Sequence, residues 1–89
     1  MRIKPDFVLR KIGDGYVVVA LGKAADEFRG IIRLNETGAF LFKAIQEGGQ
    51  TIDDLISALE REYQVDVTVA RKDVSAFVNQ LQEAGAIVA

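Results

Sequence analysis

The hydrophobic period of this chain changes at one point, and that change constrains the fold more than any other feature. Up to Leu34 the apolar residues come in short runs rich in Val, Ile and Phe, which is typical of β-strands. From Asn35 onward they recur at intervals of three and four, which is typical of helices with one buried face. Because Asn35 is a good N-cap and directly follows Ile31–Leu34, we predict a strand that enters a helix through a one-residue hinge.

Three strands are predicted before this point. Gly13-Asp14-Gly15 separates Phe7–Ile12 from Tyr16–Leu21, which indicates a β-hairpin. The second run of this hairpin is apolar without alternation, so either both of its faces are covered or its outer face meets another molecule. Gly22–Glu27 is polar and turn-like, and a third strand is expected over about Phe28–Leu34.

The first of three predicted helices begins after the Asn35 cap. Gly38 falls on its apolar face, where glycine costs about 1 kcal/mol relative to alanine. That cost is offset if another backbone must come close to this position. Gly48-Gly49 is expected to end the helix with a left-handed cap.

The second and third helices also have recognisable starts. Thr51, with Asp54 three residues later, approximates a capping box for the second helix. The third is expected to begin near Thr68, with Asp66 as an alternative cap, and to end at Gly85. Residues 86–88 then either add a short strand or cover the core.

The predicted order is therefore β-β-β-α-α-α, an α+β fold. Eighty-nine residues predict one domain, with a three-stranded antiparallel sheet over residues 1–34 and a three-helix bundle over residues 35–89. Two helices separated by a turn, beside a hairpin, resemble a winged helix-turn-helix.

Composition argues against an enzyme. The chain has no cysteine and no histidine, which excludes disulfides, thiolate and imidazole metal sites, and the commonest general base near neutral pH. A carboxylate-only magnesium or calcium site stays open in principle. However, the acidic pair Asp53-Asp54 lies in a predicted first helical turn, where the helix dipole favours acidic side chains. We predict no catalytic residue, no cofactor and no metal.

The same sequence predicts a cytoplasmic protein without membrane association. No apolar run approaches the roughly 20 residues of a membrane span, and Met1–Asp6 lacks the apolar region of a signal peptide. Residues 1–34 hold seven Lys and Arg against four Asp and Glu, whereas residues 35–89 hold four against nine. The basic first part either favours an acidic partner or reflects scattered surface charge.

A winged helix usually suggests DNA binding, but the third helix is poorly suited to it. Its only cations, Arg71 and Lys72, lie near its start and are opposed by Asp73 and Glu83. Recognition helices need Lys and Arg because phosphate neutralisation supplies much of the affinity. A nucleic-acid or transcription module is therefore the alternative function, and we expect no nucleic acid as partner.

Peptide capture is the other use of such a shape. If the hairpin pairs with one side of the third strand, the other side is an open edge onto which a foreign strand can add. The third helix then provides the opposite wall of a groove. Two alternatives stay open at this point: an ordinary edge strand without a ligand, and a homodimer formed through the same edge.

Several blocks of the sequence resemble the PqqD family of pyrroloquinoline quinone (PQQ) synthesis and its relatives in other peptide-modification pathways. The resemblance covers nearly the whole chain, up to Gly85-Ala86-Ile87-Val88. Its specific part is the block Leu34-Asn35-Glu36-Thr37-Gly38-Ala39 with the later pair Gly48-Gly49. It implies a RiPP recognition element, a non-catalytic, cofactor-free domain that binds the leader of a ribosomally made precursor peptide as an added strand. Such domains act as peptide chaperones for a maturation enzyme, commonly a radical SAM protein.

Carried onto this chain, the resemblance implies a peptide-binding site on the third strand and the third helix. Its residues are Arg29, Gly30, Ile31, Ile32, Arg33, Leu34, Asp73, Ala76, Phe77 and Gln80. Alternation predicts that Ile31 and Arg33 point away from the helices. Ile32 and Leu34, which alternate with them, are also candidates for the core, as is Phe77.

Two positions depart from the family pattern. Phe42 stands where the family often has tryptophan, a change within the predicted core. Gln46-Glu47-Gly48 stands where members of the quinone pathway tend to carry Cys-Asp-Gly. The second departure argues against PQQ synthesis specifically and favours a relative that serves another peptide.

Overall fold

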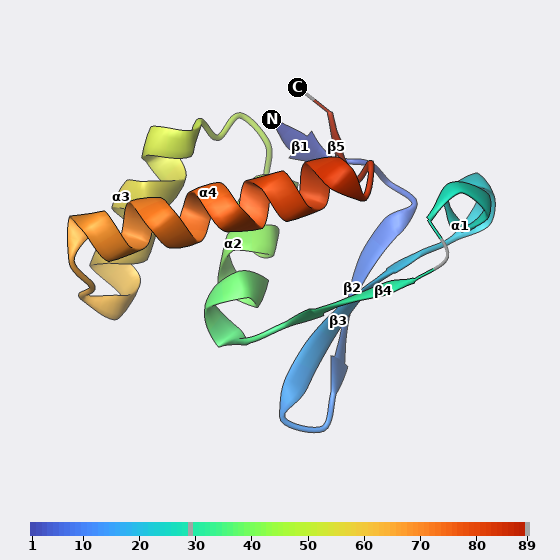
Figure 1. The fold of residues 1–89 in the computed structure, drawn as a ribbon, viewed down its shortest axis with the longest axis horizontal. Helices are drawn as coiled ribbons and strands as arrows, with labels where there is room; N and C mark the ends of the chain where they lie inside the picture. Colours follow the sequence, from blue (N-terminus) through green and yellow to red (C-terminus); the bar gives the residue numbers. More distant parts are fainter. Residues whose placement is uncertain (29, 89) are drawn as a thin grey trace.

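The chain folds into a three-stranded antiparallel sheet beside three long helices, as Figure 1 shows. This computed structural model describes residues 1–28 and 30–88. The elements follow the order β1 (Arg2–Ile3), β2 (Phe7–Ile12), β3 (Gly15–Ala20), α1 (Gly22–Glu27), β4 (Ile31–Leu34), α2 (Glu36–Gln46), α3 (Ile52–Tyr63), α4 (Val67–Glu83) and β5 (Ile87–Val88). The predicted α+β class is confirmed. In the part of the chain described, no helix is long and apolar enough to cross a membrane.

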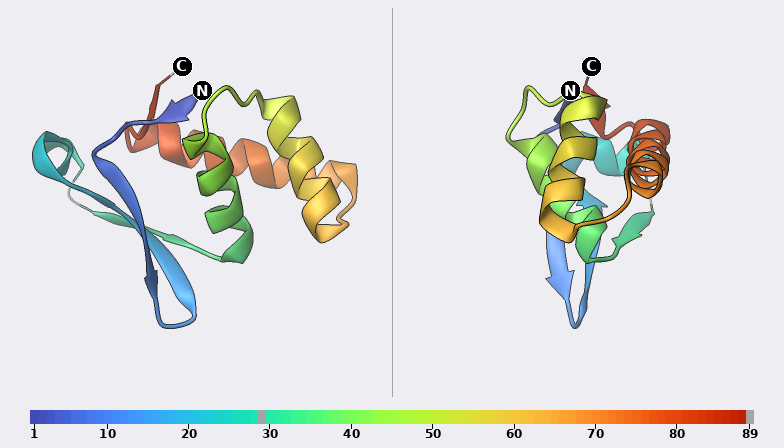
Figure 2. Two further views of the ribbon diagram at one scale, coloured as in Figure 1. Left: turned by 180° about the vertical axis from the view of Figure 1, so that it is seen from behind. Right: turned by 90° about the vertical axis from the view of Figure 1, so that its left-hand side faces the viewer.

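The larger sheet has the strand order β2-β3-β4, with both pairs antiparallel. Its first two strands form the predicted hairpin, whose turn begins at Gly13 with a positive φ of 59°. In Figure 1, β4 runs below α4 and leads into α2. The two views in Figure 2 show the hairpin extending away from the helices.

A second sheet, formed by β1 and β5, joins the two ends of the chain. Ile3 pairs with Ile87 and Arg2 with Val88. Of the two roles predicted for residues 86–88, the terminal strand is the one the structure adopts. Its partner β1 was not predicted, because two residues are too few to show a period.

Two predictions about the segment before β4 need correction. Gly22–Glu27, expected to be a turn, is the short helix α1; the helix formers Lys23, Ala24 and Ala25 outweigh its polar character. The strand expected over Phe28–Leu34 contains only Ile31–Leu34, because Phe28 is still bonded through its backbone N–H to the carbonyl oxygen of Ala24.

The predicted caps determine where the long helices begin. The Asn35 side chain accepts a hydrogen bond from the Gly38 N–H at 2.8 Å, which fixes the hinge between β4 and α2. α4 begins at Val67, one residue from the predicted start near Thr68, and the alternative cap, Asp66, accepts from the Thr68 N–H at 3.0 Å. Gly48 and Gly49, with φ of 83° and 74°, follow α2 in the left-handed conformation predicted for them.

The capping box of α3 gives stability a specific acid dependence. Thr51 N–H donates to Asp54 Oδ2 at 2.9 Å, and Asp54 N–H donates to Thr51 Oγ1 at 3.1 Å. The bonds from the Thr51 backbone and then the Thr51 side chain hold the pKa of Asp54 below its ordinary value of 3.8. A lowered folded-state pKa contributes stability that is present above the unfolded-state value and is lost as the pH falls through the folded-state value.

We therefore expect Asp54→Asn to lose less stability than the wild type does when the pH falls from about 5 to below the ordinary Asp value. Thermal unfolding followed by circular dichroism at a series of pH values measures this. The matched control is Asp53→Asn, in the same helical turn. Parallel acid profiles for Asp54→Asn and the wild type would contradict this role of Asp54.

The core lies between one face of the larger sheet and the three long helices. Phe42 and Ile45 of α2 are fully buried at its centre, and Val18 of β3 faces them from the sheet. All three helices contribute one stripe, as the 3.6-residue period predicts. The remaining buried members of the cluster are Phe7, Ile32, Leu34, Leu41, Leu55, Ile56, Leu59, Ala70, Val74, Phe77, Val78, Leu81 and Ala86.

Candidate functional site

β4 is an edge strand. It pairs with β3 on one side, in the register Val18 to Ile32 and Val17 to Arg33. Within residues 1–28 and 30–88 no strand pairs with its other side. An edge of this kind exposes backbone donors and acceptors that another chain can use.

The hydrogen-bond pattern identifies which backbone groups face that free side. Leu21 N–H donates to the Asp6 carbonyl oxygen at 2.8 Å, which continues the β2–β3 ladder by one pair. In an antiparallel ladder every second pair is hydrogen-bonded, so Val17 and Val19 direct their N–H and C=O groups toward β2. The residues between them direct theirs toward β4.

It follows that the N–H and C=O groups of Ile32 and Leu34 are hydrogen-bonded to β3, since these residues lie opposite Val18 and Tyr16. The N–H and C=O groups of Ile31 and Arg33 therefore point toward the free edge. These two residues carry the backbone groups of the strand that β3 does not use.

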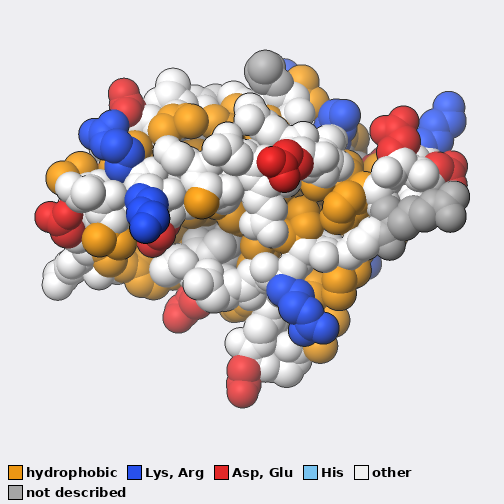
Figure 3. Space-filling model, in the orientation of Figure 1, with side chains coloured by type: hydrophobic (Ala, Val, Ile, Leu, Met, Phe, Trp, Pro, Cys, Tyr) orange, Lys and Arg blue, Asp and Glu red, His pale blue; other side chains and the backbone are white. Residues whose placement is uncertain are grey.

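The α4 helix stands opposite this edge and completes a groove of about 330 Å³. The groove, here called the β4–α4 groove, is lined by Arg33, Leu34, Asn35, Thr37, Gly38, Leu41, Asp73, Ala76, Phe77 and Gln80. Its α4 wall presents residues at i, i+3, i+4 and i+7, one face of the helix. In Figure 3 hydrophobic side chains gather between α4 and the sheet on this side of the molecule.

Side-chain burial along β4 alternates as predicted. Ile31 is 50% exposed and Arg33 is exposed, whereas Ile32 and Leu34 are only 4% and 8% exposed. Phe77, at 7%, belongs to the core and also lines the groove. The apolar floor of the groove, formed by Leu34 and Phe77, is thus the edge of the core. The inward side chains of β4 are buried, so a partner would meet mainly the backbone of this strand.

The structure brings most of the predicted site residues together. Those that share the β4–α4 groove are Arg33, Leu34, Asp73, Ala76, Phe77 and Gln80. Ile31 and Ile32 lie on the same strand. Gly30 precedes the strand and, with Ile31, lines a separate hollow beside α1. Of the segment Arg29–Leu34 predicted to pair with a peptide, Ile31–Leu34 form the strand β4 and Gly30 precedes it, whereas Arg29 lies outside the described residues.

Sequence reasoning missed the end wall of the groove, which is the first turn of α2. Asn35, Thr37, Gly38 and Leu41 line it. A Cβ atom at Gly38 would lie 3.2 Å from Leu34 Cβ and 3.3 Å from Asn35 Oδ1. The glycine predicted to permit a close approach therefore does so, but toward side chains rather than toward another backbone. The signal was present in the sequence, because the one-residue hinge places this turn directly beside β4.

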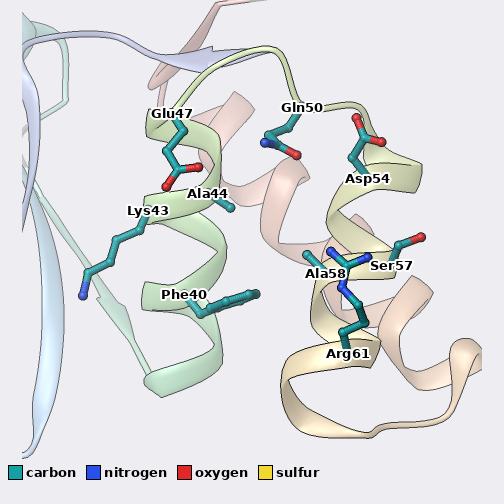
Figure 4. A pocket seen from close by; sticks show the side chains of 9 residues that line it. All are labelled: Phe40, Lys43, Ala44, Glu47, Gln50, Asp54, Ser57, Ala58 and Arg61. Carbon is teal, nitrogen blue, oxygen red and sulfur yellow. The ribbon is translucent and has the colours of Figure 1, made fainter.

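A larger hollow, of about 520 Å³, lies between α2 and α3. Figure 4 shows Phe40 and Ala44 from α2 facing Ala58 from α3 across it. Its walls are helices, whose backbone N–H and C=O groups are hydrogen-bonded within each helix. A peptide in this hollow could therefore not form the backbone hydrogen bonds of an added strand. The Nζ atom of Lys43, a residue that lines this hollow, lies 5.8 Å from the centroid of the Tyr16 ring on β3. The β4–α4 groove is the better candidate site despite its smaller volume.

Comparison with known proteins agrees with this assignment of the fold. The family described as coenzyme PQQ synthesis protein D (PqqD) matches residues 15–87. No curated protein matches the sequence significantly. Two solved structures superimpose over almost the whole chain.

The first is TbiB1 in complex with the TbiA(beta) leader peptide, with a TM-score of 0.72, 22% identity, and coverage of 97% of this chain and 93% of that chain. The second is a lasso peptide synthetase B1 complexed with the leader peptide, with a TM-score of 0.73, 26% identity, and coverage of 99% and 96%. The family match covers most of the sequence, and the chain belongs to the PqqD family.

Proposed function

We propose that this protein binds the leader of a ribosomally made precursor peptide as a fourth strand on the free edge of β4. The peptide side chains that point inward occupy the β4–α4 groove, and the protein itself carries out no chemistry. The observation that carries the proposal is the free backbone edge of Ile31 and Arg33 facing the α4 wall. Two proteins of the same fold were solved with leader peptides, which supports it.

The size of the site is compatible with useful but moderate affinity. Two outward-facing residues provide about four ladder hydrogen bonds, each worth about 0.5–1.5 kcal/mol net. One or two apolar anchors in the groove add about 1.5–3 kcal/mol each. Association costs about 4–15 kcal/mol, and the peptide must also be ordered. We therefore expect micromolar to sub-micromolar binding.

The bound peptide is then presented to a modifying enzyme, for which a radical SAM protein is our first expectation. β-augmentation suits this role because the peptide is held by its backbone along one short stretch, which leaves the rest of its length free. The departure at Gln46-Glu47-Gly48 favours a peptide pathway other than PQQ synthesis.

NMR titration of the labelled protein with a candidate leader peptide encoded nearby tests the proposal. We expect shift changes confined to Ile31–Leu34 and to the face of α4 that carries Asp73, Phe77 and Gln80. The control is a scrambled peptide of the same composition. Shifts along α4 with duplex DNA at low salt, and none with peptide, would favour the nucleic-acid alternative. Concentration-dependent shifts of β4 without any peptide would instead indicate pairing with a second copy.

A further inference from the structure

The face of the sheet turned away from the helices, here called the outer face, is arranged in two rows that run across all three strands. The register places Val8, Val19 and Ile31 side by side in an apolar row. It places Arg10, Val17 and Arg33 side by side in the next row. Opposed residues on neighbouring strands point to the same face, so each row is a continuous line of side chains.

The second row has an apolar centre between two cations. Val17 is only 5% exposed although it points away from the helices, and it lies outside the main core cluster. Its neighbours in the row, Arg10 and Arg33, are exposed. Arginine buries its aliphatic stem along apolar surface and keeps its guanidinium group in water. We attribute the burial of Val17 to these two flanking stems.

A strand that adds to β4 extends both rows by one residue each. Its residue opposite Arg33 continues the cationic row, and its residue opposite Ile31 continues the apolar row. Because Ile31 and Arg33 are two positions apart, the two peptide residues are also two positions apart. The residue between them lies opposite Ile32 and points to the groove side.

We propose, resting on the proposed function, that the outer face selects peptides that carry an acidic residue opposite Arg33 and an aliphatic residue opposite Ile31. The ligand class is thus a short extended segment with an acidic and an aliphatic residue separated by one position. Arg33 forms a cross-strand ion pair with the acidic residue, and Ile31 packs against the aliphatic residue.

The charges around β4 agree with this placement. Asp26 lines the hollow beside Ile31, so an acidic peptide residue is disfavoured at that end. Asp73 stands on the α4 wall of the groove, on the other side of the added strand. The outer face near Arg33 is therefore the position on the strand where a carboxylate is favoured.

The order of the two residues in the ligand reports the direction of the bound strand. An antiparallel strand places the acidic residue before the aliphatic one, whereas a parallel strand places it after. The order of the two residues in selected peptides therefore shows whether the bound strand is antiparallel or parallel to β4, which a dissociation constant does not show.

Display selection of short randomised peptides on the immobilised protein tests the inference. Four baits are compared: the wild type, Arg33→Ala, Arg33→Glu and Arg10→Glu. The last is a matched charge change in the same row but away from the edge. We expect wild-type ligands rich in Asp or Glu two positions from an aliphatic residue. Arg33→Glu should shift that position to Lys or Arg, and Arg10→Glu should shift it far less.

Dissociation constants of one selected peptide and its Asp→Lys counterpart then give a double-mutant cycle with Arg33→Glu. We expect each mismatched pair to bind about two- to fivefold more weakly than the matched pairs, the range for an exposed cross-strand ion pair. Peptides that bind β4 with the same residue preferences for every bait would overturn the inference and leave the proposed function intact. Recovery of no peptide that shifts β4 in NMR spectra would overturn both.

Discussion

Arg33→Pro is expected to abolish or strongly weaken peptide binding while the protein stays folded. The Arg33 N–H points to the free edge, so proline at this position removes a donor that β3 does not use. The residue before it, Ile32, is already extended, as proline requires. A bound peptide would lose one ladder bond and keep an unsatisfied carbonyl group, at a cost of about 1–3 kcal/mol. That corresponds to a loss of about fivefold to 150-fold in affinity.

Two control variants separate the backbone effect from the side chain and from the fold. Arg33→Ala removes the guanidinium group but keeps the N–H, so its affinity for a selected peptide should fall only about two- to fivefold. Ile32→Pro removes an N–H that bonds to β3 and should unfold the sheet. The measurement is isothermal titration of each folded variant, with backbone NMR spectra as the check of folding. Equal affinities of Arg33→Pro and Arg33→Ala would show that the strand edge is not where the peptide adds.

The same alternation explains how much of this site could be predicted. Period and capping place the end of β4, the start of α2 and the inward and outward side chains of the strand correctly, because each depends on residues close together in sequence. The facing residues of α4 come from the family resemblance, and their position across the groove depends on tertiary packing. Sequence alone could not establish that Ile31 and Arg33 expose their backbone groups. That follows from the hairpin register, which sets the parity of hydrogen bonding in both neighbouring strands.

The errors have local physical causes. α1 was predicted as a turn because it has no apolar period, and in the structure it contains no buried residue and no side-chain cap. β1 and β5 are strands only because they pair with each other. Such a pair of two-residue strands forms only when the fold brings these two distant segments together. The end wall of the groove was missed because Gly38 was interpreted as a core position that another backbone approaches, and not as part of a groove. In the structure the absence of its side chain also shapes the groove beside Leu34.

The largest effect on stability is expected from Phe42→Ala. Phe42 is fully buried and belongs to the cluster that joins the sheet to all three long helices. Removing a phenylalanine side chain from such a position costs about 3–5 kcal/mol, which combines lost transfer free energy with the cavity left behind. A domain of this size usually has a total stability of about 5–13 kcal/mol. The variant should therefore lose a large part of its stability and unfold at a much lower urea concentration, as measured by circular dichroism and urea titration.

Phe40→Ala is the matched control, because it makes the same substitution on the same helix. Phe40 is half-buried, lines the hollow between α2 and α3, and contacts Tyr63 edge to face with ring centroids 5.6 Å apart. It forfeits that aromatic pair, worth about 0.5–1.5 kcal/mol, and the burial of part of one ring, so it should remain folded. If both variants lost the same stability, the centre of the core would not lie at Phe42. If Phe40→Ala keeps full affinity for a peptide selected on β4, the hollow between α2 and α3 takes no part in binding.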